Sequence, residues 1–146
     1  MKKNLFSFLN QLSQTKNKNS TMDQLNFQGT EDTPTIVIDK SKELFQISGR
    51  SLPEDVTSFY KPVIEWLELF SESPTKNFTM EVKLEYFNTA SSKIILDILM
   101  KLEEIHQAGS SAIQVNWHYD KRDDDMLEAG EEYQELVEIP FELLSY

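Results

Sequence analysis

The stretch that decides the fold is Leu84-Glu85-Tyr86-Phe87-Asn88-Thr89-Ala90-Ser91-Ser92-Lys93. It joins a strand-like alternation of apolar and polar residues, which starts at Phe78, to a helix-like apolar periodicity that continues to Ile105. A helix that begins here leaves its first backbone N–H groups unpaired and carries the positive end of its dipole, so it favours a negative group. Asn88 can act as the N-cap residue. We therefore expect an exposed Thr89 hydroxyl at a strand-to-helix corner.

That hydroxyl is a candidate phosphorylation site. Phosphate on Thr89 would add about −1.5 to −2 charges beside the helix start. Asn88, Ser91 and Ser92 could hydrogen-bond the phosphate, and Lys93 could pair with it. A Thr between a strand and a helix can also be no more than a capping or turn residue, and this alternative stays open.

The flanking pattern predicts the remaining elements. Strands are expected at 35–39, 44–50, 78–86, 113–119 and 137–143, and Pro140 indicates that the last strand lies at a sheet edge. Helices are expected from about Ser58, from the Thr89 corner to Gly109, and over 123–136. The first helix is placed near Ser58 because Pro62 is tolerated in a first turn. The third strand is expected to bury one set of side chains: Phe78, Met80, Val82, Leu84 and Tyr86.

The resulting order is β-β-α-β-α-β-α-β, with helices long enough to connect parallel strands. It predicts an α/β fold, a single domain at 34–146 with a mixed sheet of about five strands and helices packed on it. Residues 1–33 are expected to form a flexible extension, because 10–33 are dominated by Asn, Gln, Ser, Thr and Lys. An apolar stripe near its start could form a short helix: Leu5, Phe6, Phe8, Leu9 and Leu12.

Composition excludes several classes of function. The 146 residues carry a formal net charge of −11, which disfavours binding to nucleic acid or anionic lipid. The chain has no Cys and no apolar run near the ~20 residues that a membrane span needs. Its basic start lacks the cleavage site of a signal peptide, so we expect a cytoplasmic protein with no membrane span.

Candidate catalytic chemistry is sparse. The four glycines cannot build a glycine-rich phosphate loop, and no nucleophile has a recognisable partner motif. His118 and Asp120 precede the acidic run 123–125, so a metal-binding protein or small enzyme built around them is one alternative. A solvated acidic turn that caps a helix explains the same residues better. We expect no enzyme activity, no metal and no cofactor.

From about Leu25 onward the sequence resembles the SiaC family of bacterial regulatory phosphoproteins. The resemblance rests on the corner motif 84–93. Five other stretches support it: Gly29-Thr30, Thr33-Pro34, Ile47-Ser48-Gly49-Arg50-Ser51-Leu52-Pro53-Glu54, Phe59-Tyr60-Lys61-Pro62 and Trp66-Leu67. It implies a fold similar to STAS domains. It also implies that Thr89 is phosphorylated by a Ser/Thr protein kinase and dephosphorylated by a PP2C-type phosphatase.

The resemblance further implies partner switching. The unphosphorylated form would bind and activate a diguanylate cyclase involved in biofilm formation and aggregation, and phosphate on Thr89 would repel that effector or recruit another. Expected partner contacts are Glu54, Tyr60 and Glu85. An anti-sigma factor antagonist with the same fold is the alternative that the sequence leaves open. Ala90 stands where the family often has another Ser, and 1–24 have no recognisable counterpart.

Overall fold

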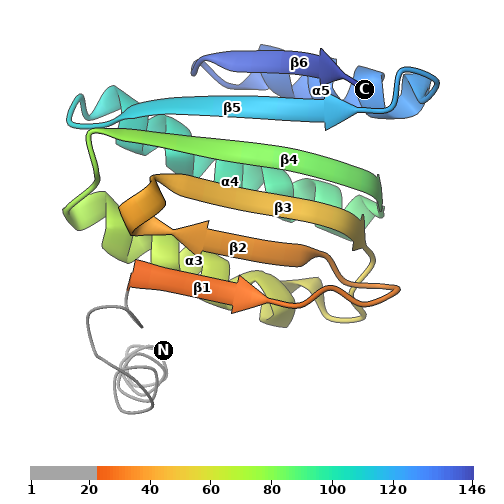
Figure 1. The fold of residues 1–146 in the computed structure, drawn as a ribbon, viewed down its shortest axis with the longest axis horizontal. Coiled ribbons are helices and arrows are strands. Elements are labelled where there is room, and N and C mark those ends of the chain that lie inside the picture. Colours follow the sequence, from red (N-terminus) through yellow and green to blue (C-terminus); the bar gives the residue numbers. More distant parts are fainter. Residues whose placement is uncertain (1–22) are drawn as a thin grey trace.

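The computed structural model describes residues 23–146 as one six-stranded mixed sheet with its helices on one face (Figure 1). The strands lie in the sheet in sequence order, from β1 at one edge to β6 at the other. The elements are β1 (Gln24–Phe27), β2 (Thr35–Asp39), β3 (Leu44–Ser51), α3 (Val56–Glu72), β4 (Asn77–Phe87), α4 (Thr89–Gln107), β5 (Ala112–Tyr119), α5 (Asp124–Leu136) and β6 (Phe141–Ser145). A short 3₁₀ turn, Lys40–Lys42, joins β2 to β3.

The topology changes at β3. Strands β1, β2 and β3 pair antiparallel, whereas β3 to β6 pair parallel and are each connected by one helix. The predicted α/β class and mixed sheet are confirmed, but the sheet has six strands rather than about five. This arrangement brings the carboxyl ends of β3, β4 and β5 to one edge, beside the starts of the helices that follow them.

The strand that sequence reasoning missed is β1. Residues 24–27 were assigned to a flexible extension, and that assignment is wrong for them. Leu25 pairs with Ile38 and is buried, and Phe27 pairs with Ile36 and is partly buried. Two apolar residues in a short polar segment give almost no periodic signal, and the strand forms because β2 offers an open edge. The rest of the predicted extension up to residue 22, including the apolar stripe of residues 5–12, lies outside the described residues.

The first helix begins earlier than predicted. Asp55 caps α3, and its Oδ1 accepts a hydrogen bond from the Ser58 N–H at 3.1 Å. Pro62 is therefore inside the helix rather than in its first turn. The prediction placed too much weight on the proline and too little on the Asp cap. The buried face of α3 is Tyr60, Val63, Trp66, Leu67 and Phe70, with Phe59 only partly buried.

A β-bulge near the end of β4 reverses which side chains of the strand face the core. Gly49 pairs with Leu84 but Arg50 pairs with Tyr86, so Glu85 is an extra residue on β4. The alternation shifts by one residue beyond that point. Tyr86, predicted to be buried, is 46% exposed, and Phe87 instead packs against Trp117 with ring centroids 6.1 Å apart. The bulge thus sets the orientation of the chain as it enters α4.

The last strand is shorter and later than the predicted 137–143. Val137 and Ile139 are buried but precede β6, which begins directly after Pro140. The prediction of an edge strand is confirmed, because β6 pairs only with β5 in this sheet of described residues. None of the helices within 23–146 has the length and apolar character that crossing a membrane requires.

Candidate functional site: the corner between β4 and α4

Thr89 is the first residue of α4, and its side chain is exposed. The preceding Asn88 has an extended backbone, and its Oδ1 accepts a hydrogen bond from the Ser91 N–H at 2.8 Å. The predicted capping role of Asn88 is therefore confirmed. Because Asn88 supplies the cap, the Thr89 hydroxyl lies at the outer surface of a helix start, where the dipole favours a negative group.

Ser91 does not belong to the surface of this corner. Its side chain is fully buried, and its Oγ donates to the Ser51 carbonyl oxygen at 2.9 Å. We expected Ser91 to contact a phosphate, and the structure contradicts this, because the side chain points from the helix start into the protein. The sequence showed three consecutive hydroxyl-bearing or small residues after Thr89 without indicating which one faces inward.

Ser92 and Lys93 lie on the outer side of α4. The Ser92 hydroxyl donates to the Thr89 carbonyl oxygen at 2.6 Å, which occupies its single hydrogen. Lys93 is exposed and lies one helical turn beyond Thr89. Pairing of Lys93 with a phosphate stays a prediction.

The three expected partner contacts separate into two groups. Glu54 and Glu85 are exposed, so their proposed contacts stay predictions. Tyr60 is fully buried, and its hydroxyl lies 2.6 Å from the Ser51 Oγ. The prediction for Tyr60 is wrong, because its ring fills the space between α3 and the sheet and offers a partner no surface.

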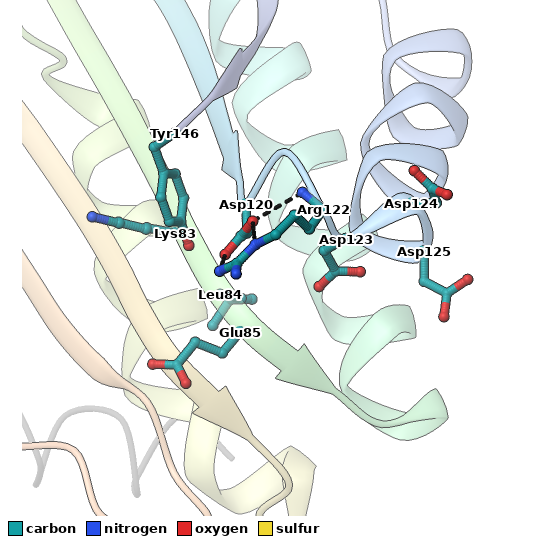
Figure 2. Close-up of a pocket in the computed structure, with 9 residues that line it drawn as sticks. All are labelled: Lys83, Leu84, Glu85, Asp120, Arg122, Asp123, Asp124, Asp125 and Tyr146. Atoms are coloured by element: carbon teal, nitrogen blue, oxygen red, sulfur yellow. Dashed lines mark hydrogen bonds and ion pairs between the residues drawn. The ribbon is translucent and has the colours of Figure 1, made fainter.

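An acidic cleft lies at the same edge of the sheet (Figure 2). It encloses about 1010 Å³ and is lined by Lys83, Leu84, Glu85, Asp120, Arg122, Asp123, Asp124, Asp125 and Tyr146. Glu85, the bulge residue of β4, also lines this cleft and lies only four residues before Thr89. Phosphate on Thr89 would therefore add negative charge to an edge that is already acidic.

Two basic side chains in the cleft are engaged with neighbours. Both carboxylate oxygens of Asp120 accept hydrogen bonds from the Arg122 guanidinium, at 3.1 and 2.9 Å. These bonds lower the pKa of Asp120 to about 2. The Lys83 ammonium lies 4.5 Å from the centre of the Tyr146 ring. Arg122 therefore neutralises Asp120, whereas the other acidic residues of the cleft keep the edge negatively charged: Glu85, Asp123, Asp124 and Asp125.

His118 and Asp120, the centre of the alternative metal or catalytic site, contact different residues and not each other. His118 Nε2 lies 2.6 Å from Glu81 Oε1 on the open face of the sheet, whereas Asp120 is held by Arg122. Among residues 23–146 no group of three or more His, Asp and Glu side chains is arranged to hold a metal ion. The geometry therefore offers this alternative no support.

Sequence reasoning also missed an apolar groove between α3 and α4. It encloses about 890 Å³, and Ile64, Ile94 and Met100 form much of its apolar lining. Met100 is 48% exposed. Ile94 belongs to the apolar repeat of the α4 sequence, yet it is only partly buried, and the sequence alone does not distinguish it from the fully buried residues of that repeat. On α4 the lining of the groove runs from Ile94, five residues after Thr89, to Glu104.

Comparisons with known proteins match most of the chain. The model of the SiaC family, described as regulatory phosphoproteins, matches residues 27–146. The chain belongs to the SiaC family. An uncharacterized protein of Pseudomonas aeruginosa (strain UCBPP-PA14) is 34% identical over 125 residues, which cover 86% of this chain and 98% of that protein.

Solved structures of SiaC from P. aeruginosa share the fold. SiaC itself superposes with a TM-score of 0.78 at 34% identity, covering 84% of this chain and 98% of SiaC. The structure of the diguanylate cyclase SiaD in complex with its activator SiaC matches with a TM-score of 0.79, 34% identity and coverage of 84% and 99%. Apo-SiaC matches with a TM-score of 0.77, 35% identity and coverage of 83% and 98%. The predicted family resemblance is therefore confirmed, and the chain is a regulatory phosphoprotein of the SiaC family.

Proposed function

We propose that this protein activates a diguanylate cyclase and that phosphorylation of Thr89 controls the activation. The observation that carries the proposal is the exposed Thr89 at the dipole-positive start of α4. Two findings support it: membership of a family of regulatory phosphoproteins, and the solved complex in which the relative SiaC is the activator of SiaD. The protein acts by binding and has no catalytic role of its own.

The charge around the corner gives the direction of the switch. Unphosphorylated Thr89 is a neutral residue that lies in the chain between Glu85 of the acidic cleft and Ile94 of the apolar α3–α4 groove. A phosphate there adds about −1.5 to −2 charges and three acceptor oxygens, and it favours partners with basic groups. We propose that the cyclase binds the unphosphorylated corner and is released on phosphorylation, with Glu54 and Glu85 among its contacts.

The switch requires two further partners. A Ser/Thr protein kinase adds the phosphate, and a PP2C-type phosphatase removes it, both in the cytoplasm. Lys93, which is exposed one turn along α4 from Thr89, would pair with the phosphate once it is present. This pairing would stabilise the phosphorylated form rather than the form that binds the cyclase.

The test measures cyclic di-GMP formation from GTP by each purified diguanylate cyclase of the source organism. Unphosphorylated protein and Thr89→Ala should activate one of these cyclases, because neither carries charge at the corner. Thr89→Glu should activate it at least several-fold less, and less completely than phosphate would, because one carboxylate has a smaller charge and fewer acceptor oxygens.

Ser110→Glu is the matched control. Ser110 is exposed in the turn between α4 and β5, at the opposite end of α4 from Thr89, so the substitution adds the same charge away from the corner. It should leave activation closer to that of the wild type. Activation of no cyclase by the unphosphorylated protein, or binding to a histidine-kinase-like anti-sigma factor instead, would contradict the proposal. So would kinase-dependent phosphorylation of Thr89→Ala to the wild-type level.

A further inference from the structure

A chain of three buried hydroxyl groups lies directly beneath the Thr89 corner. The Ser51 Oγ is 2.6 Å from the Tyr60 hydroxyl and 2.8 Å from the Ser91 Oγ. All three side chains are fully buried. They come from the end of β3, the second turn of α3 and the first turn of α4, so the hydroxyl chain joins three elements at one point.

The backbone fixes the direction of these hydrogen bonds. The Ser91 hydroxyl donates to the Ser51 carbonyl oxygen, which uses its only hydrogen. The Ser51 hydroxyl must then donate to Ser91, and the Tyr60 hydroxyl to Ser51. Burial raises the pKa of Tyr60 to about 12, so its hydroxyl stays protonated at neutral pH. The Ser51 carbonyl also accepts from the Asn88 N–H at 3.1 Å, which adds the capping residue to the same network.

A second tyrosine holds the same turn from the other side. The Tyr133 hydroxyl, from α5, donates to the Ser92 carbonyl oxygen at 2.7 Å, and the ring is 7% exposed. Its pKa is raised, chiefly by burial, so it too is a donor at neutral pH. The first turn of α4 is therefore tied to α3 through Ser91 and to α5 through Ser92.

This arrangement differs from ordinary helix packing. Hydrogen bonds are directional, so they specify the rotation of α4 and its height on the sheet in addition to what apolar packing specifies. Ser111 shows that a buried hydroxyl in this fold does not need such a network, because its Oγ has no hydrogen-bond partner among the described residues. The hydrogen bonds converge on the one turn that carries Thr89.

We propose that Ser51, Tyr60 and Tyr133 are positioning residues of the Thr89 switch, which hold the first turn of α4 from β3, α3 and α5 so that kinase and effector meet Thr89 in one geometry. The inference rests on the proposed function of Thr89. It gives Tyr60 a role inside the protein in place of the surface contact that the sequence suggested. It also implies that a change in α3 or α5 can shift the first turn of α4, and so affect Thr89, even where neither helix contacts the kinase or the effector.

The experiment compares Ser51→Ala, Tyr60→Phe and Tyr133→Phe with Ser111→Ala as the matched control. Tyr60→Phe and Tyr133→Phe keep the rings that fill the core and leave no buried donor unpaired, so both should fold. The first measurement is amide hydrogen exchange of the protein alone. Exchange within residues 88–93 should rise at least several-fold in the three variants and stay at the wild-type rate in Ser111→Ala.

The second measurement is the initial rate of Thr89 phosphorylation by the host kinase, identified by fractionating host lysate with the wild-type protein as substrate. The three variants should be phosphorylated several-fold more slowly at equal far-UV circular dichroism, and Ser111→Ala should match the wild type. Unchanged exchange within 88–93 would overturn the inference. Faster exchange with an unchanged phosphorylation rate would also overturn it, because the hydroxyl groups would then only stabilise the fold. Failure of the wild type to be phosphorylated at Thr89 would contradict the proposed function, and a positioning role for that switch would fail with it. The exchange data would still show whether the hydroxyl groups hold the first turn of α4.

Discussion

At the residue scale, Gly130 shows how one side chain position controls the packing of α5. A Cβ at this position would lie 2.5 Å from Trp117 Cδ1 and 2.7 Å from Leu143 Cδ2. Trp117 is fully buried, and its indole N–H donates to the Met126 carbonyl oxygen at 3.0 Å. The missing side chain therefore lets α5 approach the sheet closely enough for Tyr133 to reach the α4 turn.

Gly130→Ala should lower the free energy of unfolding by about 1 to 3 kcal/mol, because the added methyl group overpacks the Trp117 site. The same substitution in an exposed helix would raise stability by about 1 kcal/mol. Urea unfolding followed by Trp fluorescence measures the difference. Glu131→Ala, at the next and exposed position, is the control and should have little effect. Equal or higher stability of Gly130→Ala would show that α5 can move away without cost.

Single residues also show where sequence reasoning stops. Thr89 and Asn88 were placed correctly because a cap and an adjacent hydroxyl are local features of a helix start. Tyr60 and Ser91 were placed on the surface, whereas both are buried. Their burial depends on Ser51, which is 40 residues from Ser91 in sequence, and no local pattern reports such a contact.

At the element scale, the helices and strands that were predicted correctly are those whose apolar repeat continues over many residues. Helix α4 and strand β5 follow their patterns closely, because each buries one continuous stripe or face. The strand β1 and the bulge at Glu85 were missed for a common reason. Both are determined by a neighbouring strand, through an open edge in one case and a shift of pairing in the other.

The proline inside α3 leads to a prediction for that element. Pro62 cannot donate the backbone hydrogen bond that a residue at its position would give to the Ser58 carbonyl oxygen. Pro62→Ala should restore this bond and raise the free energy of unfolding by about 1 to 3 kcal/mol. Thermal unfolding monitored by circular dichroism tests it, with Lys61→Ala as the neighbouring control. A lower stability would mean that the proline ring packs favourably enough to offset the missing bond.

At the scale of the whole molecule, the buried tyrosines make the fold sensitive to alkali. Burial raises the pKa of Tyr60 from its ordinary value of 10.0 to about 12, and the pKa of Tyr133 moves in the same direction. Above pH 10 the unfolded chain loses these protons while the folded chain keeps them. Folding stability is therefore fully present below pH 10 and falls as the pH rises towards 12.

Tyr60→Phe should separate this effect from general alkaline unfolding. Near pH 8 the variant should be less stable than the wild type by about 1 kcal/mol, because it lacks one buried hydrogen bond. Between pH 10 and 12 the wild type should lose up to roughly 3 kcal/mol more than the variant, since each pKa unit corresponds to about 1.4 kcal/mol. The two stability curves, measured by urea unfolding at half-unit pH steps, should therefore converge and cross. Parallel curves across that range would show that the pKa of Tyr60 is the same in the folded protein as in the unfolded chain. The buried hydrogen bonds of the hydroxyl chain would then contribute less to stability than their short distances indicate.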